Sequence, residues 1–354
     1  MKLASSFVLP VSFSVFLVLF PVLLPIEAKE LESFRIGFGS CLHQDKESPV
    51  LAQWKKESFD LILLLGDNIY ADSLVAEEKI PSYRKQFARP EWKAIRSKSQ
   101  ILATWDDHDY GINDSGGEFE DKIKSREVFI SQMGSLMPKG RSFGTKDGKG
   151  IFHSYFLEFK KKKVHIVIPD TRFFRTPLKQ SFFFSFTGKK NYSPNDDDSA
   201  TILGEEQWNW LVAELNKPSD LLVFVSSVQV IPTEQPFEKW GNFPKDREKL
   251  FQLLGSAKAS DLVILSGDRH IAEIYEYPFS KDRKFVEITS SSLNLPLPFL
   301  LSEYDFEFKQ GSAFREENYG TLKIQLKSGK LIWRSEIKDK TGNVVLSYPN
   351  NDSN

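Results

Sequence analysis

The sequence has a single cysteine, Cys41, so no disulfide can form within the chain. A lone thiol is a liability in an oxidising compartment unless it is buried or bound to a ligand, and the sequence leaves both explanations open. An excess of charge of one sign is also lacking, because 47 lysines and arginines balance 48 aspartates and glutamates. Domains that bind nucleic acids usually carry a basic surplus, so we expect no nucleic acid as a partner.

Long hydrophobic runs are absent beyond the N-terminus. Residues 7–26 read FVLPVSFSVFLVLFPVLLPI and precede the triplet EAK. This pattern predicts a signal peptide over residues 1–28, cut after Ala28. The length of the run leaves an uncleaved membrane anchor as the alternative, although three prolines within it weaken that interpretation. We therefore expect an exported protein, whether periplasmic, extracellular or membrane-associated, with a main domain at 33–346 and a flexible tail at 347–354.

The rest of the chain has a globular composition, with 40% apolar and 27% charged residues, and alternates short apolar runs with helix-like segments. The apolar, β-branched runs predict strands at 34–40, 60–66, 99–105, 163–170, 220–227, 261–267 and 284–290. The segments between them predict helices at 81–98, broken at Pro90, and at 121–133, 204–216 and 246–259. Near-continuous hydrophobicity in several runs indicates strands that are covered on both faces.

The last part of the chain has a different pattern. Apolar and polar residues alternate there with a period of two around Ser328-Gly329-Lys330, which is typical of a β-hairpin. Residues 177–200 show no periodicity, and we expect a long loop. Alternating strands and helices followed by a hairpin predict the α/β fold class, with helices outside two sheets.

Polar and ionisable residues gather where the predicted strands end. They do so in six places: Ser40-Cys41-Leu42-His43, Asp67-Asn68-Ile69-Tyr70, Asp106 to Asp109, Asp170-Thr171-Arg172, Ser226 to Gln229 and Asp268-Arg269-His270. A single aspartate after a strand is a common turn or helix cap. In α/β sheets, however, ligands bind at the carboxyl ends of the strands, so the six sequences together predict one site.

One of these sequences, TWDDHD at residues 104–109, places four ionisable groups side by side. Carboxylates at such short spacing repel one another and resist burial unless cations lie among them. Oxygen donors mixed with a thiol and imidazoles favour a transition metal beside a harder ion. A two-metal centre therefore explains how Asp67, Asp107 and Asp109 can share one site.

The ordered motifs GDNIYAD, TWDDHD, DTR and GDRH each follow a predicted strand. Together they resemble the metallophosphoesterase superfamily, and specifically its alkaline phosphatase D (PhoD-like) branch. The likeness runs from Phe34 to the predicted hairpin. It implies a metallophosphoesterase-like four-layer α-β-β-α sandwich with a C-terminal β-hairpin.

The resemblance also implies roles for individual residues. Asp67 would bridge two metal ions. Further ligands would be Cys41, Tyr70 and His270 for an Fe(III) ion, and Asn68, Asp107 and Asp268 for Ca²⁺ or another divalent cation. His108 would donate a proton to the leaving group, and Arg172 would clamp the phosphate. Among the supporting residues, Asp109 would support the imidazole of His108 or a metal-bound water, and Asp170 would orient Arg172. Gln229, a water or nothing would take the position of a ligand histidine that this chain lacks.

The expected function is hydrolysis of phosphate mono- and/or diesters by a hydroxide that two metal ions activate. One alternative is a diester-specific phosphodiesterase or phospholipase-type enzyme, and another is a non-catalytic metal-binding surface protein. The expected partner is a phosphate-ester substrate, with membrane proximity left open by the N-terminal run. The sequence does not predict the oligomeric state.

Overall fold

A computed structural model describes residues 33–181, 192–297 and 307–349 of the chain. The predicted leader at 1–28 and the last five residues of the predicted tail lie outside the described residues. Within the described part, none of the helices is both long and apolar enough to cross a bilayer.

Two six-stranded sheets form the centre of the described body. The first, in the order β12-β11-β10-β1-β2-β3, contains β1 (Ser33–Gly39), β2 (Leu61–Leu65), β3 (Gln100–Thr104), β10 (Asn318–Lys327), β11 (Lys330–Asp339) and β12 (Val344–Tyr348). The second, in the order β4-β5-β6-β7-β9-β8, contains β4 (His153–Phe159), β5 (Lys162–Ile168), β6 (Leu221–Ser226), β7 (Leu262–Ser266), β8 (Ala272–Ser280) and β9 (Arg283–Ser290). Apolar side chains from both sheets, such as Leu63 and Val223, share one buried cluster, so the sheets pack face to face.

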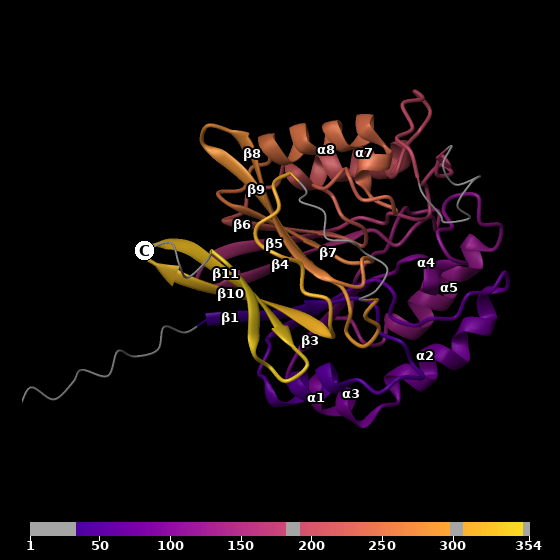
Figure 1. The fold of residues 1–354 in the computed structure, drawn as a ribbon, viewed down its shortest axis with the longest axis horizontal. Helices are drawn as coiled ribbons and strands as arrows, with labels where there is room; N and C mark the ends of the chain where they lie inside the picture. Colours follow the sequence, from indigo (N-terminus) through magenta and orange to yellow (C-terminus); the bar gives the residue numbers. More distant parts are fainter. Residues whose placement is uncertain (1–32, 182–191, 298–306, 350–354) are drawn as a thin grey trace, which may run out of the picture. The chain divides into compact units, whose positions relative to one another are not determined.

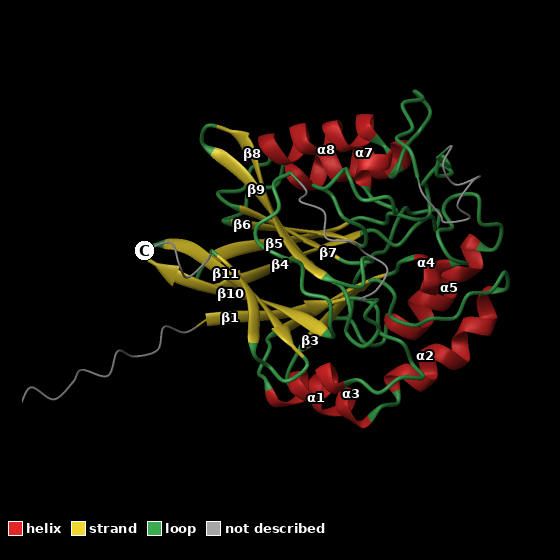
Figure 2. Cartoon of the chain, in the orientation of Figure 1, coloured by secondary structure: helices red, strands yellow, loops and turns green. Residues whose placement is uncertain are grey.

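Helices cover the outer face of each sheet (Figures 1 and 2). Those beside the first sheet are α1 (Pro49–Lys56), α2 (Ile80–Phe87), α3 (Pro90–Arg96), α4 (Asp107–Tyr110) and α5 (Lys122–Met133). Those beside the second are α7 (Gly204–Leu215) and α8 (Pro244–Ser256). Short 3₁₀ turns lie at η1 (Ala76–Lys79) and η2 (Trp240–Asn242). Each layer of helices has its own apolar cluster against its sheet, which confirms the predicted four-layer α-β-β-α sandwich.

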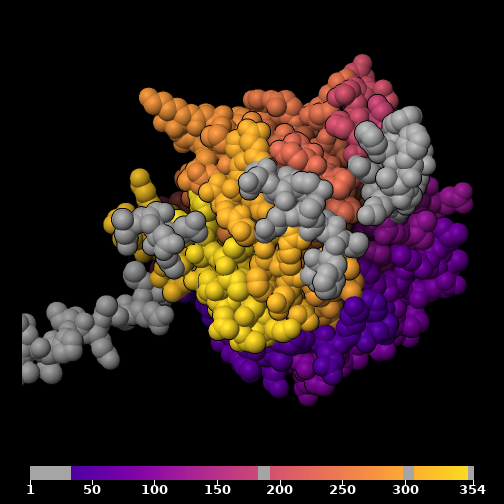
Figure 3. Space-filling view, in the orientation of Figure 1, coloured from indigo at the N-terminus to yellow at the C-terminus, as the bar shows by residue number. Residues whose placement is uncertain are grey.

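The predicted hairpin is present as β10 and β11, with Lys327 opposite Lys330. A third strand, β12, extends it and corrects the predicted domain boundary, since Tyr348 pairs with Ser335 and therefore belongs to the sheet and not to a tail. The hydroxyl of Tyr348 also donates to Glu276 on β8, which links the two sheets. In the space-filling view the yellow C-terminal strands lie beside the orange residues that include β8 and β9 (Figure 3).

The strand topology places the carboxyl ends of the parallel strands at one edge of each sheet. Strands β1, β2 and β3 are parallel neighbours in the first sheet, and β5, β6 and β7 are parallel neighbours in the second. Segments that follow parallel strands leave a sheet at the same edge. The six polar sequences therefore emerge at the carboxyl edges of the two sheets.

Candidate active site

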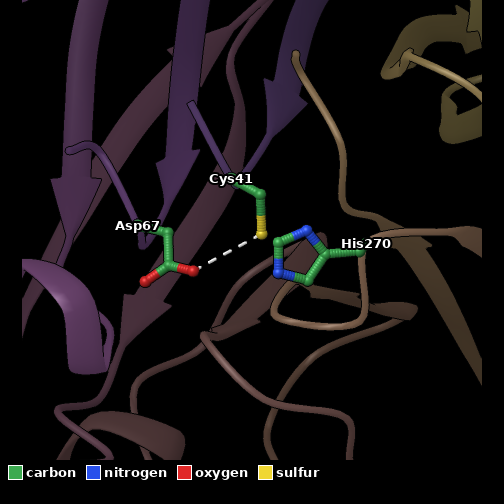
Figure 4. A group of neighbouring side chains, drawn as sticks. All are labelled: Cys41, Asp67 and His270. Atoms are coloured by element: carbon green, nitrogen blue, oxygen red, sulfur yellow. Dashed lines mark hydrogen bonds between the residues drawn. The ribbon is translucent and has the colours of Figure 1, made fainter. Parts of the chain in front are cut away.

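The carboxyl ends of β1, β2 and β7 bring three predicted metal ligands together. The ligand atoms of Cys41, Asp67 and His270 all lie within 4.8 Å of one another. Figure 4 shows the thiol between the carboxylate and the imidazole, with a dashed line for the 3.5 Å contact between Cys41 Sγ and Asp67 Oδ2. Because His270 comes from the second sheet and the other two residues from the first, the cluster joins both sheets.

Tyr70 completes this first cluster. Its hydroxyl donates to Asp67 Oδ2 at 2.8 Å and lies 3.4 Å from Nε2 of His270. Nδ1 of the same imidazole donates to the carbonyl of Leu295, which leaves Nε2 to face the cluster. The four side chains that the resemblance assigns to an iron site therefore lie together.

A second, more acidic cluster adjoins the first. Ligand atoms of Asp106, Asp107 and Asp268 lie within 4.8 Å of one another, and so do those of Asp67, Asp107 and His108. Asp67 is thus common to the thiol cluster and to a group that contains Asp107. A carboxylate in that position is placed to bridge two cations.

Backbone strain marks the same residues. Four candidate ligands have φ angles in the left-handed region, which residues other than glycine rarely adopt. The angles are 59° at Cys41, 49° at Asp67, 67° at Asp268 and 57° at His270. Each such residue costs about 1–3 kcal/mol. Four strained residues at the ends of three strands indicate that their side chains are held in place for a function and not for stability.

Unsatisfied buried oxygens also point to cations. Oδ1 of Asp67, Oδ2 of Asp106 and Oδ1 of Asp107 are buried and have no hydrogen-bond partner among the described residues. Burial and neighbouring negative charges raise the pKa of Asp67 and of Asp268 well above the usual range, and burial raises the pKa of Cys41 to about 11. Cations placed among these groups would supply the missing contacts and favour the ionised forms. The donor set therefore fits metal ions.

Asn68 and Asp109 lie next to the clusters and contact each other. The amide nitrogen of Asn68 donates to the carbonyl of Thr104 at 2.8 Å and to Asp109 Oδ2, so that only its amide oxygen remains for an ion. Asp109 also accepts from the backbone N–H of Asp106, which closes a capping box at the start of α4. Asp109 thereby supports Asn68 and Asp106.

A cavity of about 210 Å³ lies beside the acidic cluster, and His108 is in its wall. Nδ1 of His108 contacts Oδ1 of Asp72 at 2.7 Å, so Asp72 is the carboxylate that orients the imidazole. Burial alone would lower the pKa of His108, but the carboxylates of Asp107, Asp67 and Asp72 raise it to about 11. Support of the imidazole by Asp109, which the sequence left open, is absent from the described contacts.

Arg172 is fully buried and already paired. Its Nε donates to Asp106 Oδ1 at 2.6 Å, and Nη1 donates to Glu238 Oε2 at 2.5 Å. Because carboxylates occupy both sides of the guanidinium, this geometry does not support the predicted clamp on phosphate. Arg172 instead neutralises and positions Asp106, a member of the acidic cluster.

Asp170 and Gln229 are not in either cluster. Asp170 accepts from the indole of Trp105 at 2.8 Å and from the backbone N–H of Arg172 at 2.9 Å, so it holds the turn that carries the arginine. Gln229 donates its amide to Glu273 and to Thr289, each at 3.0 Å. These contacts agree with an orienting role for Asp170 and give Gln229 no described contact with the candidate ligands.

Sequence reasoning missed Asp72 and Glu238, which contact His108 and Arg172. Asp72 is the last residue of the motif GDNIYAD, but nothing in the motif shows that it contacts His108. Glu238 lies between β6 and η2, far from the end of β6, so no strand directly precedes it.

A two-sheet α-β-β-α sandwich with a thiol, phenol, imidazole and carboxylate cluster at the shared edge defines a metallophosphoesterase-like protein. The sequence model of the family described as PhoD-like phosphatase matches residues 146–325, which is half of the chain. The chain therefore belongs to the PhoD-like phosphatase family.

Two individual relatives agree with this assignment. The chain is 23% identical to alkaline phosphatase D of Bacillus subtilis (strain 168) over 288 residues, which are 70% of this chain and 47% of the relative. It thus spans about half the length of that curated relative. A solved structure of PhoD is 18% identical, with a TM-score of 0.57 over 89% of this chain and 72% of the other, and it supports the fold.

Proposed function

We propose that this protein is an exported, metal-dependent phosphoesterase that hydrolyses phosphate mono- and/or diesters. The observation that carries the proposal is the pair of adjoining clusters around Asp67, where buried carboxylate oxygens lack partners beside a cavity. Membership of a family of phosphatases supports the reaction class. The apolar run at residues 7–26 supports export.

Two cations fit the donor sets. Cys41, Tyr70 and His270 would hold Fe(III), because thiolate, phenolate and imidazole suit a transition metal. Asp107, Asp268 and the amide oxygen of Asn68 would hold Ca²⁺ or another divalent cation, with Asp67 between the two ions. When bound, such ions lower the pKa of water and neutralise charge on phosphoryl oxygens.

The chain's own residues supply the remaining chemistry. His108 lies in the cavity wall with Nδ1 bound to Asp72, so its Nε2 is the nitrogen that would carry the transferred proton. As a hydroxide ion bonds to phosphorus and the bond from phosphorus to the leaving oxygen breaks, His108 gives that proton to the departing alkoxide. Asp72 holds the ring in place, and Arg172 holds Asp106 within the acidic cluster.

Three variants test this function. Asp67→Asn should remove bound metal and turnover together, since the shared ligand is lost. His108→Asn should keep the metal but slow hydrolysis of a simple alkyl phosphate by about 10²–10⁴-fold. His153→Asn, at a histidine on β4 that does not line the cavity, is the matched control. Metal analysis and turnover of one model monoester and one model diester are the measurements, and the two esters also decide whether the enzyme is specific for diesters.

The same samples test the iron assignment. A phenolate bound to Fe(III) gives a visible absorption band, so the purified protein should be coloured and Tyr70→Phe should lose the band. Full activity in a colourless protein that holds only zinc would contradict the iron site. Full activity of His108→Asn on the alkyl ester would contradict the proton donor.

A further inference from the structure

Arg269 is a buried cation without an ionic partner among the described residues. It stands between Asp268 and His270 and is 5% exposed. Its Nε has no hydrogen-bond partner within the described part of the chain. Burial of an unpaired guanidinium is costly, so a position that retains one indicates that an anion binds there.

The guanidinium is held in a fixed plane. It lies over the ring of Phe237, with Cζ at 4.7 Å from the ring centroid. Stacking on an aromatic face orients the planar group and leaves the N–H donors at its edge free for a ligand. Arg269 and Phe237 both line the cavity that contains His108.

A second buried cationic side chain adjoins Arg269. Nζ of Lys239 donates to the carbonyl of Phe237, the residue on which Arg269 stacks, at 3.0 Å. Burial and the charge of Arg269 lower the pKa of Lys239 to about 7. The neighbouring titratable side chain is therefore an amine and not a carboxylate that could neutralise Arg269.

Asp107, Asp114, Glu238 and Asp268 line the cavity together with Arg269, and Asp107 and Asp268 belong to the candidate metal cluster. Glu238, which also lines the cavity, is shared by Arg172 and by Nε of Arg175 at 3.0 Å. Asp107 accepts from the backbone N–H of Asp114 at 2.7 Å and belongs to the candidate metal cluster. Arg269 thus has no carboxylate partner among the described residues, and an oxyanion from outside the chain fits the position.

We propose that Arg269, stacked on Phe237, forms an oxyanion subsite in the cavity wall, and that the substrate carries a second anionic group on its alcohol portion. That group is a carboxylate or a phosphate, either of which accepts two parallel hydrogen bonds from a guanidinium. The inference rests on the proposed phosphoesterase function and narrows its substrate class. The phosphoryl group that is cleaved lies at the acidic cluster, and the second anion lies at Arg269.

A matched pair of esters tests the subsite. We would measure kcat/KM of the purified full chain on phenyl phosphate and on 4-carboxyphenyl phosphate, which differ by one carboxylate. Arg269→Gln should lower kcat/KM on the carboxylated ester by about 10- to 100-fold, because a charge-assisted hydrogen-bond pair is lost. The value on phenyl phosphate should stay nearly unchanged. Phe237→Leu should weaken the same preference.

Arg96→Gln is the control, since it makes the same change of charge at an exposed arginine of α3. Equal losses on both esters with Arg269→Gln, or no loss on either, would overturn the inference. If Arg269→Gln melted at a lower temperature and lost kcat/KM equally on both esters, Arg269 would have a structural role, and the inference would also be overturned.

A failure of the proposed function can be told apart from a failure of the subsite. If the unaltered protein hydrolyses neither ester, calorimetric binding of the same two esters replaces turnover. Tighter binding of the carboxylated ester, and loss of that preference in Arg269→Gln, would support the subsite alone. Equal binding of both esters by the unaltered protein would overturn it.

Discussion

At the scale of single residues, the site depends on charges that are buried in pairs. Arg172 shows why a motif does not fix a role: DTR places an arginine after a strand, but the chain decides what surrounds it. Here Asp106 and Glu238 neutralise Arg172, whereas Arg269 has no such partner among the described residues. The contrast assigns one arginine to structure and the other to ligand binding.

Glu238 connects two buried arginines, and its loss should therefore be severe. Glu238→Ala would leave the guanidinium of Arg172 with one carboxylate fewer and would also unpair Arg175. Breaking a buried ion pair by removing one partner costs about 3–5 kcal/mol. Urea unfolding followed by tryptophan fluorescence should show this loss of unfolding free energy.

The control for that measurement is Glu316→Ala. Glu316 is an exposed partner of Lys340 at 3.9 Å, and exposed pairs contribute about 0–1 kcal/mol. Similar losses for the two variants would show that the buried network adds nothing to stability.

At the scale of elements, the sequence predicted the strands that are buried on both faces. The apolar runs at β2, β6 and β7 are continuous, because a sheet or a helix layer covers each face. Two strands at edges of the second sheet were not predicted: β4 alternates exposed and half-buried positions, and β8 contains a proline near its exposed end. Strand segments with so many exposed positions give no clear hydrophobic pattern.

Prediction from the sequence was also incomplete for the site. Ligands that directly follow a buried strand, such as Asp67 and His270, could be predicted because the topology of parallel strands gathers them. Contacts made by loops, such as that of Asp72 with His108, depend on how distant segments pack. No spacing in the sequence encodes them.

The edge strand β4 provides a prediction about pH. His153 at its start is buried, packs against Phe143 with ring centroids 4.9 Å apart, and donates Nδ1–H to the carbonyl of Ile151. Burial lowers the pKa of His153 from its ordinary value to about 4. The unfolded chain therefore binds this proton more readily than the folded chain. Stability is fully present above pH 6.5 and falls as the pH drops to about 4, by up to about 3 kcal/mol.

His153→Asn isolates this contribution, since asparagine can still donate to Ile151 and does not titrate. The difference in unfolding free energy between the two proteins should change across pH 6.5 to 4 and stay constant outside that window. A constant difference throughout would mean that His153 does not bind a proton differently in the folded state.

At the scale of the whole molecule, the candidate metal centre lies where the two sheets meet. Cys41, Asp67 and Asp107 follow strands of the first sheet, and Asp268 and His270 follow β7 of the second. Without cations, carboxylates from opposite sheets repel one another across the interface. With cations, the same groups would hold the sheets together at the carboxyl edge.

Metal removal should therefore weaken the entire fold and not only the site. A ligand that binds the folded chain alone adds about 4 kcal/mol when its concentration is 1,000 times its Kd. We expect a chelator to lower the melting temperature by several degrees, and we expect readdition of the removed ions to restore it. Asp67→Asn should melt at the lower temperature from the start and should not respond to the chelator, because it lacks the shared ligand. A chelator that abolished turnover without changing the melting temperature of the unaltered protein would contradict a metal centre that stabilises the folded chain.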